Sequence, residues 1–165
     1  MSRPGPLVVG VADLLRRPGT QRDVRVTVEL AGLALSANRV PAGAPIEVDL
    51  VVESLSEAIV ATGTIEAPWE GECRRCLRPV AGRATAEVRE IFEPHPVEGE
   101  TYPLHGDHLD LEPMVRDAVL LVLPLAPVCD EACEGPDPSD YPVTTEAEAA
   151  LDPRWEKLGD LSFED

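Results

Sequence analysis

The four cysteines are the residues whose types and spacing point most directly to chemistry, because they occur as two close pairs. The first pair is Cys73-Arg-Arg-Cys76 and the second is Cys129-Asp-Glu-Ala-Cys133, with 52 residues between them. Two short chelate loops that each donate two thiolates are typical of a tetrahedral Cys₄ zinc site. The spacing therefore predicts a structural zinc ion held by Cys73, Cys76, Cys129 and Cys133.

Arginines surround the first cysteine pair and allow two interpretations. Four thiolates on Zn²⁺ leave a local charge of −2, which Arg74, Arg75 and Arg78 could offset by donating to sulfur. Residues 69–83 also carry a net charge of +2, so these arginines could instead contact an anionic partner.

Three other roles for the cysteines stay open. A redox Cys-x-x-Cys pair normally opens a helix whose N-terminus lowers the thiol pKa, and Pro79 argues against a helix after Cys76. A zinc- or thiol-dependent redox protein that uses Cys73 and Cys76 is nevertheless the alternative function. Structural disulfides are disfavoured because we expect a cytoplasmic protein. In the last alternative, the cysteines are small buried residues that bind no metal.

The first half of the chain must position these groups, and its pattern predicts strands. Apolar and polar residues alternate over 23–30 and 46–53, which is typical of strands with one buried face. Residues 59–67 and 80–92 are two further candidate strands. Consecutive strands with short connections favour an antiparallel sheet or partial barrel. Together with the helices below, the predicted fold class is α+β.

The second half changes character. Residues 93–109 are rich in Pro, Gly, His and Glu and predict an extended, exposed connection. Asp110-Leu-Glu-Pro113 predicts the start of a helix that packs on the sheet and ends at Pro124. Thr145 and Glu148 predict a short C-terminal helix through Leu151. We therefore expect one domain over residues 1–133 and an acidic, Pro-rich extension over 134–165.

The charge of the chain is unevenly distributed. The 165 residues have a net charge of −17, and the first 83 residues hold ten basic and ten acidic side chains, so the whole excess lies in residues 84–165. This distribution argues against phosphate binding by the whole molecule and favours attraction of a basic protein. No apolar run approaches the roughly 20 residues of a membrane helix, so we expect a soluble protein with no membrane partner.

Several motifs in order resemble the YceD family of large ribosomal RNA subunit accumulation proteins. Gly71-Glu-Cys73-Arg-Arg-Cys76-Leu-Arg-Pro79 is similar to the family signature. A strand, the Asp110-Leu111 helix start and Leu123-Pro-Leu-Ala-Pro-Val-Cys129 follow in the family order. Val11–Gly19 and Asp152-Pro-Arg-Trp155 resemble the high-GC Gram-positive branch of the family.

The resemblance implies a cytoplasmic factor that supports accumulation of large-subunit ribosomal RNA and ribosome assembly. It also implies metal binding and nucleic-acid binding, so the candidate residues for direct contact with RNA are Arg74, Arg75, Arg78 and Arg83. The acidic second half of the chain makes a basic ribosomal protein the other candidate partner. Many family members carry a further Cys-x-x-Cys-Gly knuckle, whereas this chain has acidic residues and prolines over 134–141. Any zinc must therefore be bound by the four cysteines that are present.

Catalytic patterns are scarce in the sequence. His95, His105 and His108 lie in the polar connection, where we expect them to be solvated, and no nucleophile motif or phosphate-binding glycine loop occurs. We expect a non-catalytic protein without a small-molecule substrate. A general adaptor with no ribosomal role is a further alternative.

Overall fold

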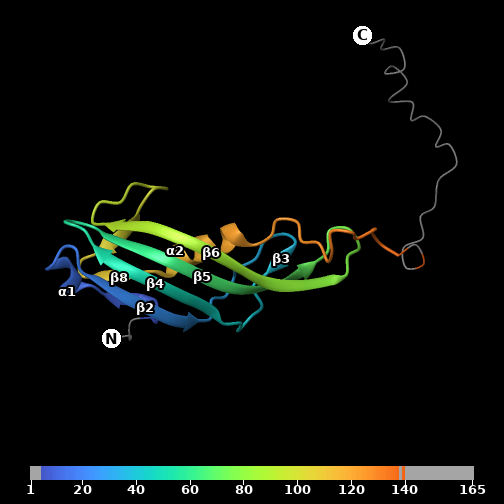
Figure 1. The fold of residues 1–165 in the computed structure, drawn as a ribbon, viewed down its shortest axis with the longest axis horizontal. Helices are drawn as coiled ribbons and strands as arrows, with labels where there is room; N and C mark the ends of the chain where they lie inside the picture. Colours follow the sequence, from blue (N-terminus) through green and yellow to red (C-terminus); the bar gives the residue numbers. More distant parts are fainter. Residues whose placement is uncertain (1–4, 138, 140–165) are drawn as a thin grey trace, which may run out of the picture. The chain divides into compact units, whose positions relative to one another are not determined.

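The computed structural model describes residues 5–137 and residue 139, and most of the regular structure in them is strand. The chain divides into two units, Met1–Gly135 and Pro136–Asp165, and every element below belongs to the first (Figure 1). The helix expected over 145–151 lies outside the described residues. The elements are β1 (Val8–Gly10), α1 (Ala12–Leu15), β2 (Gln21–Val28), β3 (Asn38–Arg39), β4 (Ile46–Ser54), β5 (Ile59–Glu72), β6 (Pro79–Glu93), β7 (Tyr102–His105), β8 (His108–Asp110) and α2 (Glu112–Val122).

The strands form one eight-stranded sheet with the order β1-β8-β7-β6-β5-β4-β2, and β3 pairs with β5 off this path. All pairs are antiparallel except β6 with β7. The longest pairing is the β5–β6 hairpin, which runs from Ile59 opposite Phe92 to Glu72 opposite Pro79. The predicted sheet is therefore confirmed, and its hairpin carries the first cysteine pair at the turn.

Alternation along the strands explains which face is buried. In β4 the side chains of Ile46, Val48, Leu50 and Val52 are buried, and Glu47, Asp49 and Glu53 between them are exposed. The period of two follows from the pleat, which directs successive side chains to opposite faces. The sequence placed the neighbouring strand at 23–30, and the structure begins and ends it two residues earlier. The four buried apolar residues of β4, with Val24 and Val28 of β2, are all part of one hydrophobic core.

The prediction of an exposed connection over residues 93–109 is wrong for its second part. Residues 102–110 form the strands β7 and β8, which turn at Gly106 with a φ of 62°. Leu104 and Leu109 are paired across the hairpin and are both buried. Leu104 and Leu109 connect the hairpin to the core together with Tyr102, which packs against it, although the local composition is that of a loop.

Helix α2 covers one face of the sheet, as the apolar spacing predicted. It begins at Glu112, with Pro113 in its first turn, and the Glu112 N–H donates to the Asp110 carboxylate at 3.0 Å. Met114, Val115 and Val119 are the buried residues of the helix. The backbone leaves the helix at Leu123, and Pro124 follows, so the chain turns away into the segment that carries the second cysteine pair.

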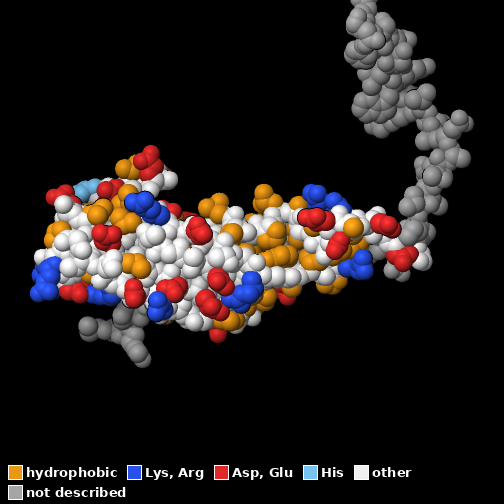
Figure 2. All heavy atoms as spheres, viewed as in Figure 1, with side chains coloured by type: hydrophobic (Ala, Val, Ile, Leu, Met, Phe, Trp, Pro, Cys, Tyr) orange, Lys and Arg blue, Asp and Glu red, His pale blue; other side chains and the backbone are white. Residues whose placement is uncertain are grey.

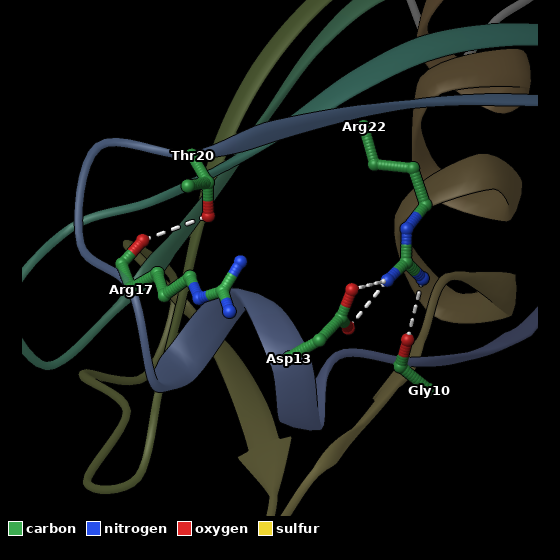
Figure 3. A network of polar contacts seen from close by, with 5 residues as sticks. All are labelled: Gly10, Asp13, Arg17, Thr20 and Arg22. Carbon is green, nitrogen blue, oxygen red and sulfur yellow. Dashed lines mark hydrogen bonds and ion pairs between the residues drawn. The ribbon is translucent and has the colours of Figure 1, made fainter.

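Arg22 joins the two strands at opposite ends of the sheet order. Its guanidinium lies on β2, donates to the Gly10 carbonyl of β1 at 2.7 Å and forms an ion pair with Asp13 of α1 (Figure 3). Thr20 donates to the Arg17 carbonyl at 2.7 Å in the connection between α1 and β2. Because β1 and β2 end the strand order, this contact shows that the sheet curls toward a partial barrel.

Candidate metal centre

The first cysteine pair occupies the turn between β5 and β6. The Cys73 N–H donates to the Arg78 carbonyl at 2.9 Å, and the Leu77 N–H donates to the Cys73 carbonyl at 2.9 Å. Leu77 has a φ of 61°, which is the left-handed conformation that reverses the chain after Cys76. The turn is not the start of a helix, so the geometry expected of a redox Cys-x-x-Cys is absent from this turn.

The second pair lies in the loop after α2 and is bound to the first by the backbone. The Arg74 N–H donates to the Pro127 carbonyl at 2.9 Å. Beyond it, the Cys133 N–H donates to the Asp130 carbonyl at 3.1 Å, and the Ala132 N–H donates to the Asp130 carboxylate at 2.7 Å. The fold thus brings together two tight loops that are far apart in the sequence.

The four sulfur atoms form a compact group whose ligand atoms all lie within 4.8 Å of one another. The Sγ atoms of Cys73 and Cys133 are 3.9 Å apart, and those of Cys76 and Cys129 are 3.6 Å apart. A tetrahedron with Zn–S bonds of about 2.3 Å has S–S edges of about 3.8 Å. A disulfide needs a bond of about 2.05 Å. The spacing fits four ligands of one ion, and all four cysteines are free thiols.

The surroundings favour the thiolate form in the first pair. Backbone N–H groups, that of Cys76 first and then that of Arg75, lower the pKa of Cys73 to about 6. The Arg78 side chain lowers the pKa of Cys76. The neighbouring thiols, that of Cys133 first, raise the pKa of Cys129 to about 12. Donors thus stabilise the thiolates of Cys73 and Cys76, while neighbouring thiols oppose ionisation of Cys129, and a bound cation would offset that opposition.

Three of the four predicted RNA-binding arginines have their guanidinium groups engaged. Arg75 donates to the carbonyls of Glu131 and Cys133 at 2.8 and 3.2 Å. Arg78 donates to the Cys76 sulfur at 3.4 Å, and Arg83 forms ion pairs with Glu47 and Glu66 at 3.0 and 3.3 Å. Arg74 is exposed and contacts the second loop through its backbone. A role of these arginines in RNA binding stays a prediction.

Two residues support the site: Asn38, which the sequence did not single out, and Gly71, which it gave only as the first residue of the family signature. Asn38 of β3 is buried, and its side-chain amide donates to the Pro124 carbonyl, at the point where the chain leaves α2 toward Cys129. Its Oδ1 atom has no hydrogen-bond partner among the described residues. Gly71 lies against Asn38, and an added Cβ would come within 2.4 Å of the Ala37 carbonyl oxygen. No local pattern distinguishes this asparagine from one in an ordinary loop.

The other candidate ligands lie apart from the cysteines. His95, His105 and His108 are exposed, as expected, and His108 contacts Asp107 at 2.6 Å. Within residues 5–137 and 139, the cysteines are the only group of three or more Cys, His, Asp or Glu side chains arranged to hold a metal. No helix in that part of the chain is long and apolar enough to cross a membrane.

Fold and site together define a class of protein: a curled, mainly antiparallel sheet, covered by one helix, that carries four clustered thiols at the turn of its longest hairpin. The family model of the large ribosomal RNA subunit accumulation protein YceD matches residues 61–162, which include both cysteine pairs. The chain belongs to the YceD family.

Mycobacterial proteins are similar to nearly the whole chain. An uncharacterized protein of Mycobacterium tuberculosis (strain ATCC 25618 / H37Rv) is 38% identical over 94% of this chain and 81% of its own length. An uncharacterized protein of Mycobacterium leprae (strain TN) is 34% identical over 94% of this chain and 77% of its own length. No solved structure matches the chain significantly.

Proposed function

We propose that this protein is a non-catalytic cytoplasmic factor that supports accumulation of large-subunit ribosomal RNA, and that it acts on the RNA or on a basic ribosomal protein during ribosome assembly. Membership of the YceD family carries this proposal, because the family is described by that role. The acidic second half of the chain supports a basic protein partner, since it would repel phosphate and attract cations.

The proposed site is a structural zinc ion bound by Cys73, Cys76, Cys129 and Cys133. The S–S distances of 3.6 and 3.9 Å support it, because they match the edge of a ZnS₄ tetrahedron. The ion would supply positive charge and a cross-link, while the chain's own donors orient the sulfurs. Arg78 donates to Cys76, and the Arg75 N–H donates to Cys73, both at 3.4 Å. In this proposal residues 1–133 are the functional domain and 134–165 an extension.

Depletion in cells tests the proposed function. Removing the protein should lower the ratio of large-subunit to small-subunit ribosomal RNA, and wild-type protein should restore it. Cys76→Ser should restore it poorly, whereas Ala132→Ser, which adds a hydroxyl beside the same site and keeps every thiol, should restore it fully. An unchanged RNA ratio after depletion would contradict the ribosomal role.

Thiol titration separates the zinc site from redox chemistry. We expect one zinc per chain by elemental analysis, with four thiols that react only after a chelator is added. A reversible disulfide between Cys73 and Cys76 in metal-free protein would support the redox alternative instead. A pull-down at low salt, with and without nuclease, shows whether RNA or protein is the partner.

A further inference from the structure

The strand β6 has an edge without a neighbouring strand among the described residues. Along one side it pairs with β5 over residues 79–92, but along the other it pairs with β7 only at Phe92 and Glu93. An unpaired edge of this length presents a row of free N–H and C=O groups to any extended chain.

The register shows which residues direct their backbone outward. The Cys73 N–H bonds to the Arg78 carbonyl across the hairpin, so this pair is hydrogen-bonded, and the next pair, Glu72 with Pro79, is not. The Glu72 N–H accordingly points the other way, to the Ala37 carbonyl at 3.3 Å. Alternation then directs the N–H and C=O groups of odd-numbered residues of β6, such as Thr85 and Glu87, to the free edge.

A groove runs along this edge beside α2. It has a volume of about 300 Å³ and is lined by the four consecutive residues 85–88, together with Met114, Ala118 and Leu121 of the helix. Consecutive strand residues alternate between the two faces, so a groove that touches all four reaches the backbone of β6. A second hollow of about 520 Å³ shares Glu90, Tyr102 and Leu121 with the groove and continues it toward residues 99–101.

The chemistry of the groove is acidic with an apolar rim. Leu121 is 86% exposed, and Figure 2 shows further hydrophobic side chains at the surface of the β5–β6 hairpin toward its turn. Asp117 accepts a hydrogen bond from the Tyr102 hydroxyl at 2.9 Å. No Lys or Arg is among the residues that line either hollow. The carboxylates that line them are Glu87, Glu90, Glu100 and Asp117.

We propose that a protein partner binds here by adding an extended segment, rich in Arg or Lys and with one apolar side chain, as a further strand on the free edge of β6. The outward backbone groups would bond the segment, its cationic side chains would face Glu90 and Asp117, and its apolar side chain would pack on Leu121. The acidic lining disfavours RNA at this edge. The inference rests on the proposed function, because it assigns the surface that would bind a basic ribosomal protein.

Fluorescence anisotropy with a labelled peptide of alternating Arg and Val tests the strand addition. Thr85→Pro removes one outward N–H and leaves the bonds to β5, whereas Thr85→Ala keeps that N–H. We expect at least about tenfold weaker binding for Thr85→Pro than for Thr85→Ala, with similar melting temperatures. Equal binding by the two variants, or equal binding of a helical Ala–Lys peptide of the same charge, would overturn strand addition at this edge.

Charge reversal tests the choice of partner. Glu90→Lys with Asp117→Lys should weaken binding of the Arg–Val peptide by at least about tenfold, and Asp23→Lys with Glu53→Lys, the same charge change on β2 and β4, should weaken it far less. The proposal would be contradicted if wild-type protein did not bind the peptide. It would also be contradicted if a labelled RNA oligonucleotide competed with the peptide for the groove. The ribosomal RNA ratio after depletion tests the proposed function separately, so the two failures are distinguishable.

Discussion

The two ends of the β5–β6 hairpin are stabilised by different means. At the end near Ile59 and Phe92 both residues are fully buried in the hydrophobic core, and Phe92 stacks on Tyr102 with ring centroids 5.3 Å apart. At the other end, only Cys73 and Cys76 are buried among residues 68–83. A hairpin that extends beyond its core has little apolar surface to bury, so another interaction must hold its tip. The clustered thiols, with a bound ion, would be that interaction.

Metal removal should cause the largest loss of local stability, and this loss should be confined to the cysteine end of the hairpin. Apparent zinc-binding free energies of structural sites are about 10–16 kcal/mol, which exceeds what the few local contacts at the tip supply. After chelation, or in Cys73→Ser, we expect faster amide hydrogen exchange at Arg74, whose N–H bonds Pro127, and little change in β2 and β4. Hydrogen-exchange mass spectrometry measures both regions in one experiment.

If chelation instead accelerated amide exchange equally at Arg74 and in β2 and β4, the two ends of the hairpin would unfold as one unit. Ala132→Ser is the matched control, because it alters the second loop without removing a sulfur. An unchanged melting temperature in Cys73→Ser, together with no metal by elemental analysis, would refute the zinc site.

A cavity at the core end of the hairpin should cause the next largest loss of stability. This loss should affect the core and leave the cysteine end unchanged. Phe92→Ala removes a fully buried ring, and such substitutions cost about 3–5 kcal/mol of unfolding free energy. Ile91→Ala, at the neighbouring position with 40% exposure, should cost much less. Denaturant unfolding measures both values. Zinc content per folded chain should stay unchanged, and a loss of zinc in Phe92→Ala would indicate that the core end positions the cysteines.

The sequence predicted the elements whose periodicity is long, and it also predicted the cysteine cluster. Strands β2 and β4 and helix α2 follow from alternation or helical spacing over eight or more residues, and β5 and β6 were placed as candidate strands, β5 without its last five residues. The short β1, β3, β7 and β8 were missed, because two to four residues carry too little pattern. Leu104 and Leu109, for example, are buried only because the rest of the fold places a hydrophobic core against them.

The supporting contacts of the site could not be predicted for a different reason. Asn38 reaches the Pro124 carbonyl across 86 positions of sequence, and Arg75 reaches the Glu131 carbonyl across 56. Such contacts depend on tertiary distance, which no local spacing encodes. The cysteine cluster was predictable because two close pairs have the spacing that is typical of chelate loops, whereas hydrogen-bond partners of a backbone carbonyl follow no such spacing.

Within the cysteine end of the hairpin, an added side chain at Gly71 should lower stability by an intermediate amount. An added Cβ would come within 2.4 Å of the Ala37 carbonyl oxygen and 2.8 Å of the Asn38 side chain, so β3 must shift. We expect Gly71→Ala to lower the free energy of unfolding by about 1–3 kcal/mol. Gly10→Ala is the control, because a Cβ there meets nothing within 4 Å. Equal melting temperatures for the two variants would show that β3 can shift without loss of stability, and that its position is not needed to hold the Asn38 amide against the Pro124 carbonyl.

Loss of the Arg22–Asp13 ion pair, which helps to join β1 and β2, should lower stability least, because the pair lies near the surface. The Asp13 side chain is 64% exposed, and Arg22 beside it holds the pKa of Asp13 below its ordinary value of 3.8. Since the folded pKa is the lower one, the pair stabilises the fold fully above about pH 4, and this stabilisation is lost as the pH falls through the folded pKa. Asp13→Asn should lower the melting temperature by less than about 4 °C at neutral pH. The difference from wild type should decrease as the solution is acidified, and a constant difference from neutral pH down to about pH 3 would show that the ion pair does not stabilise the closed sheet.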